Sequence, residues 1–323
     1  MPHTAHRAAL DFEAPIVELE NKIEELRTFS RSTNVDLSDQ IAQLIERCNE
    51  KKRAIFSKLT PWQKVQTARH PGRPLTTDYI HHLVEDFIEL HGDRAFRDDP
   101  AILCGLGRID GQRFLIAGHR KGKDTAEKLA CNFGCPHPEG YHKARLKMAV
   151  AEKFRLPILT FINTPGAYPG VGAEERGQAF VIAQNLMEMS LLRVPVICVV
   201  IGEGGSGGAL GIAVGDRILM MEHAYYSVIS PEGCAAILWK TAEFKERAAD
   251  TLKLTAEDLK RFGVIDEVIP EPLGGAHRDH GQAAASVKEA VLRHFAEIKD
   301  LDPDERCRRR YLKFKAMGIY KEN

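Results

Sequence analysis

The sequence predicts an α/β fold built on a largely parallel sheet, with helical additions at both ends. In the middle of the chain, short apolar runs of strand length alternate with longer segments of helical periodicity. These short runs are apolar at nearly every position rather than at every second one, as in parallel strands buried on both faces. A length of 323 residues with 44% hydrophobic residues suits one large domain with a real core.

The N-terminal region, residues 1–70, is predicted to be a helical hairpin extension. A helix is expected over 15–29, where apolar side chains recur at spacings of three and four. These side chains are Ile16, Leu19, Ile23 and Leu26. After a short polar linker a second helix is expected over 37–59, and two prolines and a glycine then break the pattern. The hairpin could dock a partner chain or pack on its own domain.

The central segment, residues 71–280, is expected to form the main α/β domain. After a helix over 76–90, strands are predicted at 101–106, 113–118, 157–162, 195–201 and 217–221. Helices are predicted at 140–154, 174–192 and 208–214.

Residues 281–323 are expected to form a charged helical tail. Its basic patch is interpreted as a solvated helix face, with phosphate binding as the alternative. The patch consists of Arg306, Arg308, Arg309 and Arg310.

Composition excludes several classes of function. Lysine plus arginine equal aspartate plus glutamate, 45 each, so the chain as a whole does not attract nucleic acid or an acidic membrane. No apolar run approaches the ~18 to 20 residues that span a bilayer, and residues 1–11 lack the apolar core of a signal peptide. Seven scattered cysteines form no disulfide framework, which indicates a cytoplasmic protein. Cys131, Cys135 and His137 lack the second cysteine pair usual in zinc sites, so no metal is expected on this chain.

A glycine-rich turn, IGEGGSGGALG at residues 201–211, lies between a predicted strand and a short helix. One interpretation is the nucleophile elbow of a serine hydrolase, because Ser206 stands in a G-x-S-x-G pattern. That chemistry would need an acid and a histidine later in the chain. The available pairs combine Asp216 or Asp266 with His277 or His280.

The same turn fits two other chemistries. Gly202 to Gly207 match the G-x-G-x-x-G fingerprint of dinucleotide sites, with Glu222 about 20 residues on as the ribose-binding acid. Alternatively, the backbone amides of Gly207 and Gly208 could form an oxyanion hole. The pattern alone leaves all three chemistries open, together with a plain tight turn.

A second glycine-containing loop, NTPGAYPG at residues 163–170, follows the strand predicted at 157–162. Ligands of open α/β sheets bind outside the carboxyl ends of the strands, where both loops should lie. Together they would line a cleft with backbone amides and few acids or bases, which suits stabilisation of an enolate or another oxyanion. Glu174 and Glu175 are expected to open the next helix and to interact with its dipole.

Longer motifs carry a resemblance to a known family. The segments TPGAYPGVGAEERGQ at 164–178, IGEGGSGGAL at 201–210, YSVISPEGC at 226–234 and IPEPLGGAH at 269–277 resemble the alpha subunits of acetyl-CoA carboxylase carboxyltransferase. The likeness covers essentially the whole chain. Asn163 departs from the aspartate expected in the family, which puts in doubt only a charged role at that position.

The resemblance implies a crotonase-like (ClpP/crotonase) fold of repeated ββα units, with the active site between two subunits. It implies a beta subunit that carries a zinc ribbon and the acetyl-CoA half of the site. The pair would transfer the carboxyl group of carboxybiotin, held on a biotin carboxyl carrier protein, to acetyl-CoA, forming malonyl-CoA for fatty acid synthesis.

The resemblance also implies that ATP is used elsewhere in the complex, by a biotin carboxylase. In agreement, residues 118–124 lack the spacing of a P-loop. Lys147 is followed by Met148 but preceded by Leu146, so it lacks the methionine pair that flanks a biotinylated lysine. A non-catalytic alternative is an assembly subunit, in which the hairpin and the tail organise partner proteins.

By this resemblance, Gly207 and Gly208 would stabilise the biotin-derived oxyanion, and no side-chain base would be needed. A side chain at either glycine is expected to cost ~10²- to 10³-fold in rate, partly through backbone strain. The basic loop from His119 to Lys123 is interpreted as a solvated charge run, or as a contact for CoA phosphates or for the carrier domain. The carboxybiotin pocket would be formed by Gly166, Ala167, Tyr168, Gly204, Gly205 and Ser206.

Overall fold

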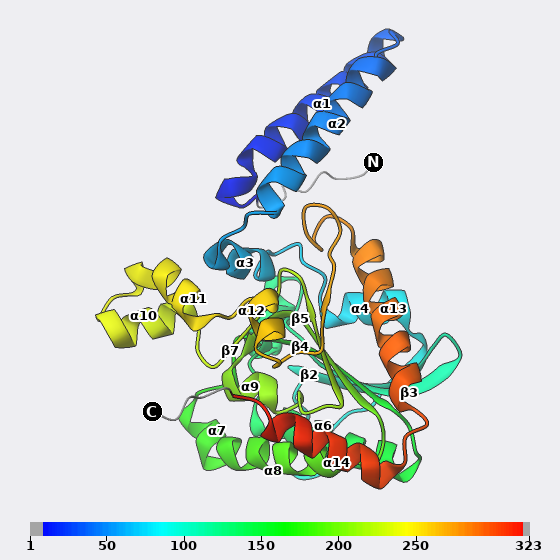
Figure 1. Ribbon diagram of the computed structural model, residues 1–323, viewed down its shortest axis with the longest axis vertical. Helices are drawn as coiled ribbons and strands as arrows, with labels where there is room; N and C mark the ends of the chain where they lie inside the picture. Colours follow the sequence, from blue (N-terminus) through cyan, green and yellow to red (C-terminus); the bar gives the residue numbers. More distant parts are fainter. Residues whose placement is uncertain (1–8, 319–323) are drawn as a thin grey trace.

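A long helical hairpin stands away from an α/β body in the computed structural model, which describes residues 9–318 (Figure 1). The prediction about the polar N-terminus falls largely on residues 1–8, which lie outside the described residues. The hairpin consists of a 3-10 turn at Asp11–Glu13, α1 (Ala14–Thr33) and α2 (Ser38–Phe56), joined by a turn with Asn34 in the left-handed region (φ 54). A small apolar cluster that includes Ile16 and Ile23 holds the two helices together, as the periodicity predicts.

The body is organised around an eight-stranded sheet with the order β1-β2-β3-β4-β5-β6-β8, and β7 pairs with β5. The first three strands are antiparallel, and β3, β4, β5, β6 and β8 run parallel. Every residue of β4 and β5 is buried, which confirms the prediction of strands covered on both faces. The strands are β1 (Glu85–Glu89), β2 (Ile102–Ile109), β3 (Gln112–His119), β4 (Ile158–Thr164), β5 (Val196–Gly205), β6 (Arg217–Met221), β7 (Tyr225–Ser227) and β8 (Glu267–Ile269).

Helices surround this sheet. α6, α8 and α14 lie together along the lower side in Figure 1, whereas α10 and α11 form a small lobe at its left. None of the helices within residues 9–318 is both long enough and apolar enough to cross a membrane. The helices after the hairpin are α3 (Pro61–Ala68), α4 (Thr76–Leu83), α5 (Thr125–Ala130), α6 (Pro138–Lys153), α7 (Val171–Glu175), α8 (Gln178–Leu191), α9 (Ser206–Leu210), α10 (Pro231–Trp239), α11 (Lys245–Leu252), α12 (Ala256–Arg261), α13 (His280–Ile298) and α14 (Pro303–Lys315).

The helix predicted over 76–90 is wrong in its second half. α4 ends at Leu83, and the chain continues as the edge strand β1, antiparallel to β2. Phe87 of β1 lies over Gly105 of β2, where an added Cβ would come within 2.3 Å of the Phe87 ring. Glycine in the partner strand therefore makes room for this aromatic side chain, and that packing overrides the helical spacing.

The helix predicted over 174–192 is divided into α7 and α8. Gly177 between them has φ 82, in the left-handed region that interrupts a helix. Glu174 and Glu175 consequently belong to the short helix α7 and do not open the longer one.

The interpretation of the C-terminal arginines as a solvated face is wrong for two of the four. Arg306 and Arg310 are one helical turn apart on α14 and are 3% and 1% exposed. Arg310 pairs with the buried Asp216 at 2.8 Å, and Arg306 donates hydrogen bonds to the carbonyls that follow α13. These contacts attach α14 to the body, and only Arg308 and Arg309 face solvent.

Candidate active site

The two glycine-containing loops meet at one edge of the sheet. β4 and β5 are parallel neighbours, and Thr164 pairs with Gly204 in their register. The loop after β4 and the turn from β5 into α9 therefore leave the sheet side by side, at the carboxyl ends of the strands. The prediction that these loops are adjacent is confirmed.

Backbone contact between the loops is closest at Gly208. A Cβ added there would lie 2.3 Å from the Ala167 nitrogen and 2.5 Å from the Gly166 carbonyl carbon. At Gly207 the nearest atom to such a Cβ is a methyl group of Ile182, at 4.0 Å. Neither Gly207 nor Gly208 has a positive φ, so the expected backbone strain is wrong for both. Gly208 is required by close approach, whereas Gly207 borders open space.

Backbone amides lie at this junction. Gly207 and Gly208 lie in the first turn of α9, where N–H groups have no acceptor within the helix. The Gly166 amide donates to the Thr164 hydroxyl at 3.0 Å, which leaves the Ala167 amide as the donor offered by the first loop. No described residue accepts a hydrogen bond from the Ala167 amide. The amides of Ala167, Gly207 and Gly208 are thus donors of the kind that an oxyanion hole uses.

The carbonyl of Gly208 is held by two buried side chains. The Tyr141 hydroxyl of α6 donates to it at 3.0 Å, and His119 Nε2 at the end of β3 lies 3.2 Å from it. Asn185 of α8 donates to the Gly211 carbonyl at 2.9 Å, just after α9. Three elements of the body therefore fix the position of this short helix.

The other predicted pocket residues have packing roles. The Tyr168 ring lies against that of His137, tilted by 34° with 4.2 Å between centroids, and its backbone amide donates to the Pro136 carbonyl. Gly204 and Gly205 are buried, and a Cβ on Gly205 would lie 2.1 Å from the Pro165 carbonyl oxygen. Close packing of the chain accounts for both glycines.

The serine hydrolase interpretation is not supported by the geometry. Ser206 is exposed with φ 53, a strained conformation like that of a nucleophile elbow. Its proposed acids and bases have other partners, however. Asp216 pairs with Arg310, Asp266 with Lys313, His277 with Glu13, and His280 with the Gly72 carbonyl.

The dinucleotide interpretation is also not supported. Glu222, the expected ribose acid, accepts a hydrogen bond from the Glu271 amide at 3.2 Å. The antiparallel β2–β3 pair within the sheet also departs from the doubly wound arrangement of dinucleotide-binding domains.

A buried ion-pair network beside the turn was not anticipated from the sequence. Glu203 of β5 is 6% exposed and pairs with Lys121 and with Arg69, whose Nε lies 2.7 Å from its carboxylate. Burial alone would raise the pKa of Glu203, but these two cations lower it to about 2. Lys121 is therefore not part of a solvated charge run. A single acid inside an otherwise apolar strand was the available signal, because such a charge must be paired.

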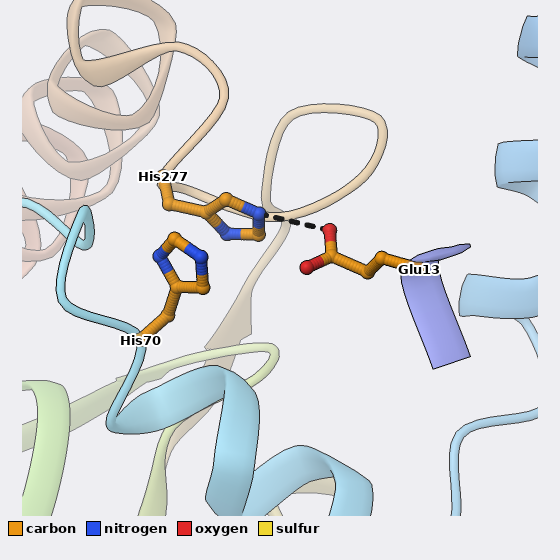
Figure 2. Close-up of side chains that lie close together, drawn as sticks. All are labelled: Glu13, His70 and His277. Carbon is orange, nitrogen blue, oxygen red and sulfur yellow. Dashed lines mark hydrogen bonds and ion pairs between the residues drawn. The ribbon is translucent and has the colours of Figure 1, made fainter. Parts of the chain in front are cut away.

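A second buried cluster lies where the hairpin joins the body (Figure 2). Glu13, His70 and His277 bring one donor atom each within 4.8 Å of the others. His277 Nε2 lies 3.1 Å from the Glu13 carboxylate, and its ring stacks on His70 with centroids 4.0 Å apart. Burial would raise the pKa of Glu13, but hydrogen bonds from His277 and Arg278 lower it to about 2.

This arrangement favours a hydrogen-bonded joint over a metal centre. A shared ion would need the in-plane lone pairs of both imidazoles to point at one position, whereas the rings are stacked with only 28° between their planes. The Gly72 amide donates to His70 Nδ1 at 3.0 Å, and Arg278 already neutralises Glu13 from 2.8 Å.

The sequence of the whole described chain matches one family. The family described as acetyl co-enzyme A carboxylase carboxyltransferase-like matches residues 9–318. A relative from Syntrophotalea carbinolica, named acetyl-coenzyme A carboxylase carboxyl transferase subunit alpha, is 57% identical over 97% of this chain and 99% of its own length. A relative of the same name from Thermus thermophilus is 53% identical over 97% of this chain and 99% of its own. The chain belongs to this carboxyltransferase alpha-subunit family.

Solved structures of more distant proteins share the fold of this chain. A transcarboxylase 12S structure superposes with a TM-score of 0.54 at 20% identity, covering 68% of this chain and 42% of that one. A Pseudomonas malonate decarboxylase hetero-tetramer gives a TM-score of 0.56 at 14% identity, covering 66% and 85%. The predicted crotonase-like architecture is confirmed.

Proposed function

We propose that this chain, as a carboxyltransferase alpha subunit, provides the carboxybiotin side of a site that transfers a carboxyl group to acetyl-CoA, forming malonyl-CoA. The observation that carries the proposal is the junction of the two loops. It offers the amides of Ala167, Gly207 and Gly208, and no serine–histidine pair is assembled there among the described residues. Such a site can stabilise negative charge on oxygen but has no nucleophile of its own.

The residues at the junction suit a planar cyclic urea. Open space beside Gly207 lets such a ring approach the backbone, and unengaged amides can donate to its oxygen. Bound there, carboxybiotin supplies the carboxyl group and a ureido oxygen that becomes negative as that group departs. The amides stabilise this charge in a preorganised position, where one donor is worth ~2.7 to 4 kcal/mol.

The acceptor side of the reaction is assigned to a partner. Two relatives are named as alpha subunits, which supports a second, beta subunit. We assign to that subunit the binding of acetyl-CoA and the zinc ribbon. A biotin carboxyl carrier protein would present carboxybiotin, and a biotin carboxylase would use the ATP. We assign the carboxybiotin pocket to the two loops, with Tyr168 and Ser206 at its border.

The test is the reverse half-reaction, in which malonyl-CoA and biocytin yield acetyl-CoA. It is run with this chain alone, with a beta subunit alone, and with the two mixed. Activity confined to the mixture is expected. If the two chains associate but no mixture is active, the proposed carboxyl transfer is wrong.

A further inference from the structure

Helix α9 is too short to fix its own geometry. It has five residues, and isolated helices shorter than ~12 to 15 residues are marginal in water. Its Gly208 carbonyl also lacks a backbone partner, because the Ile212 amide donates to the Ala209 carbonyl and not to that of Gly208. The direction of the Gly207 and Gly208 amides therefore depends on contacts from outside the helix.

Two buried donors supply those contacts at one atom, the Gly208 carbonyl oxygen. The Tyr141 hydroxyl lies 3.0 Å away and His119 Nε2 3.2 Å away, and both side chains are fully buried. The backbone amide of Asn163 donates to His119 Nδ1 at 3.3 Å, so the proton of the neutral ring is on Nε2, facing Gly208. Burial lowers the pKa of His119 to about 3, which keeps the ring neutral.

The backbone of the first loop also lies against Gly208. A Cβ there would lie 2.3 Å from the Ala167 nitrogen and 2.5 Å from the Gly166 carbonyl carbon, so α9 is already in close contact with this loop. The two donors hold the Gly208 carbonyl in addition. A glycine-rich turn has many accessible conformations, and this combination selects one of them.

We infer that His119 and Tyr141 are positioning residues for carboxyl transfer, which hold the Gly207 and Gly208 amides toward the Ala167 amide through the Gly208 carbonyl. The inference rests on the proposed function. Neither side chain touches the reacting atoms: each acts through the peptide that it anchors. Catalytic donors must be held within ~0.5 Å of their productive position, so loss of either hydrogen bond to the Gly208 carbonyl should lower the reaction rate.

The experiment measures the reverse half-reaction of the complete chain mixed with its beta subunit. Tyr141→Phe removes only the hydroxyl. The matched control is Tyr79→Phe, because Tyr79 is also fully buried but its hydroxyl has no hydrogen-bond partner among the described residues. His119→Leu removes the second donor, and His119→Gln restores an amide donor at a similar reach.

Tyr141→Phe is expected to lower kcat by about 2- to 10-fold, the worth of one neutral hydrogen bond. The KM for malonyl-CoA and for biocytin and the association with the beta subunit should stay unchanged. Tyr79→Phe should retain the original kcat. His119→Leu should lose more activity than His119→Gln, and the pH profile of His119→Gln should superimpose on the original between about pH 6 and 9.

Three outcomes would overturn the inference. If Tyr141→Phe and Tyr79→Phe have the same kcat, the Gly208 anchor does not matter for the rate. If His119→Gln loses one limb of the pH profile, His119 transfers protons and is not a positioning residue. If the unsubstituted mixture is inactive, the proposed function fails as well, and the first measurement of the series shows this separately.

Discussion

Gly208→Ala is the substitution that the geometry of the site constrains most. The new Cβ would lie 2.3 Å from the Ala167 nitrogen, whereas ordinary contacts begin at 3.4 Å. The Cβ is bonded directly to the α9 backbone and its neighbours are backbone atoms of the first loop, so relief requires α9 and that loop to separate by about 1 Å. That displacement is roughly twice the ~0.5 Å tolerance of catalytic donors.

The expected result is a loss of ~10²- to 10³-fold in kcat, the effect of losing one oxyanion donor. Overpacking should also lower the free energy of unfolding by ~1 to 3 kcal/mol. The assay is the reverse half-reaction with the beta subunit present. Association and thermal melting are measured alongside, so that lost assembly is not taken for lost catalysis.

Two further alanines separate steric effects from those of the site. Gly281→Ala on α13 serves as the control, because its Cβ meets nothing closer than Asp279 Oδ1 at 3.5 Å. Gly207→Ala fits without moving the loops, because its Cβ has no neighbour closer than 4.0 Å. A loss of activity in this variant would therefore indicate that the ligand contacts the backbone at residue 207. A folded, associated Gly208→Ala with nearly the original kcat would refute the assignment of this junction as the oxyanion site.

Three other predictions concern stability and chemistry. Arg310→Met leaves Asp216 buried and unpaired, so urea unfolding should show a loss of about 3 to 5 kcal/mol, while the exposed control Arg309→Met should change it by less than about 1 kcal/mol. Glu13 is depressed from an ordinary pKa of 4.5 to about 2, so its stabilisation of the hairpin joint is complete above about pH 4.5 and lost as pH falls toward 2. The protection of the α1 amides against hydrogen exchange, relative to the intrinsic exchange rate at each pH, should therefore fall over that interval in the original chain but change less in Glu13→Gln, and an equal fall in both would contradict it. A fluorophosphonate probe should leave Ser206 unlabelled, and stoichiometric labelling would revive the hydrolase interpretation.

Local patterns were sufficient for the framework of the fold. The strands later found as β4 and β5 were predictable because apolar residues at every position indicate burial on both faces. The adjacency of the two glycine loops followed from that assignment, since consecutive parallel strands end at the same edge. Both inferences need only nearby residues and a general rule of sheet geometry.

What remained hidden depends on partners far along the chain. Nothing near residue 87 indicates that Gly105 will make room for its ring and convert a helical pattern into an edge strand. The burial of Arg310 depends on Asp216, 94 residues earlier. In both cases a tertiary contact decides between two locally acceptable structures.

The position of the glycine turn also depends on residues far along the chain, and it affects how well the backbone amides can stabilise negative charge. A site made of backbone amides needs no unusual side chain, so its motif consists of glycines whose conformation the motif alone does not determine. Position is supplied by His119 and Tyr141, which would pass as ordinary core residues. The electrostatics of the turn also depend on distant residues. Glu203 lies in this turn, and an unpaired carboxylate would repel negative charge that develops nearby. Its pairing with Lys121 and Arg69 neutralises this repulsion. Side chains that need not contact the ligand therefore determine whether the amides can stabilise negative charge.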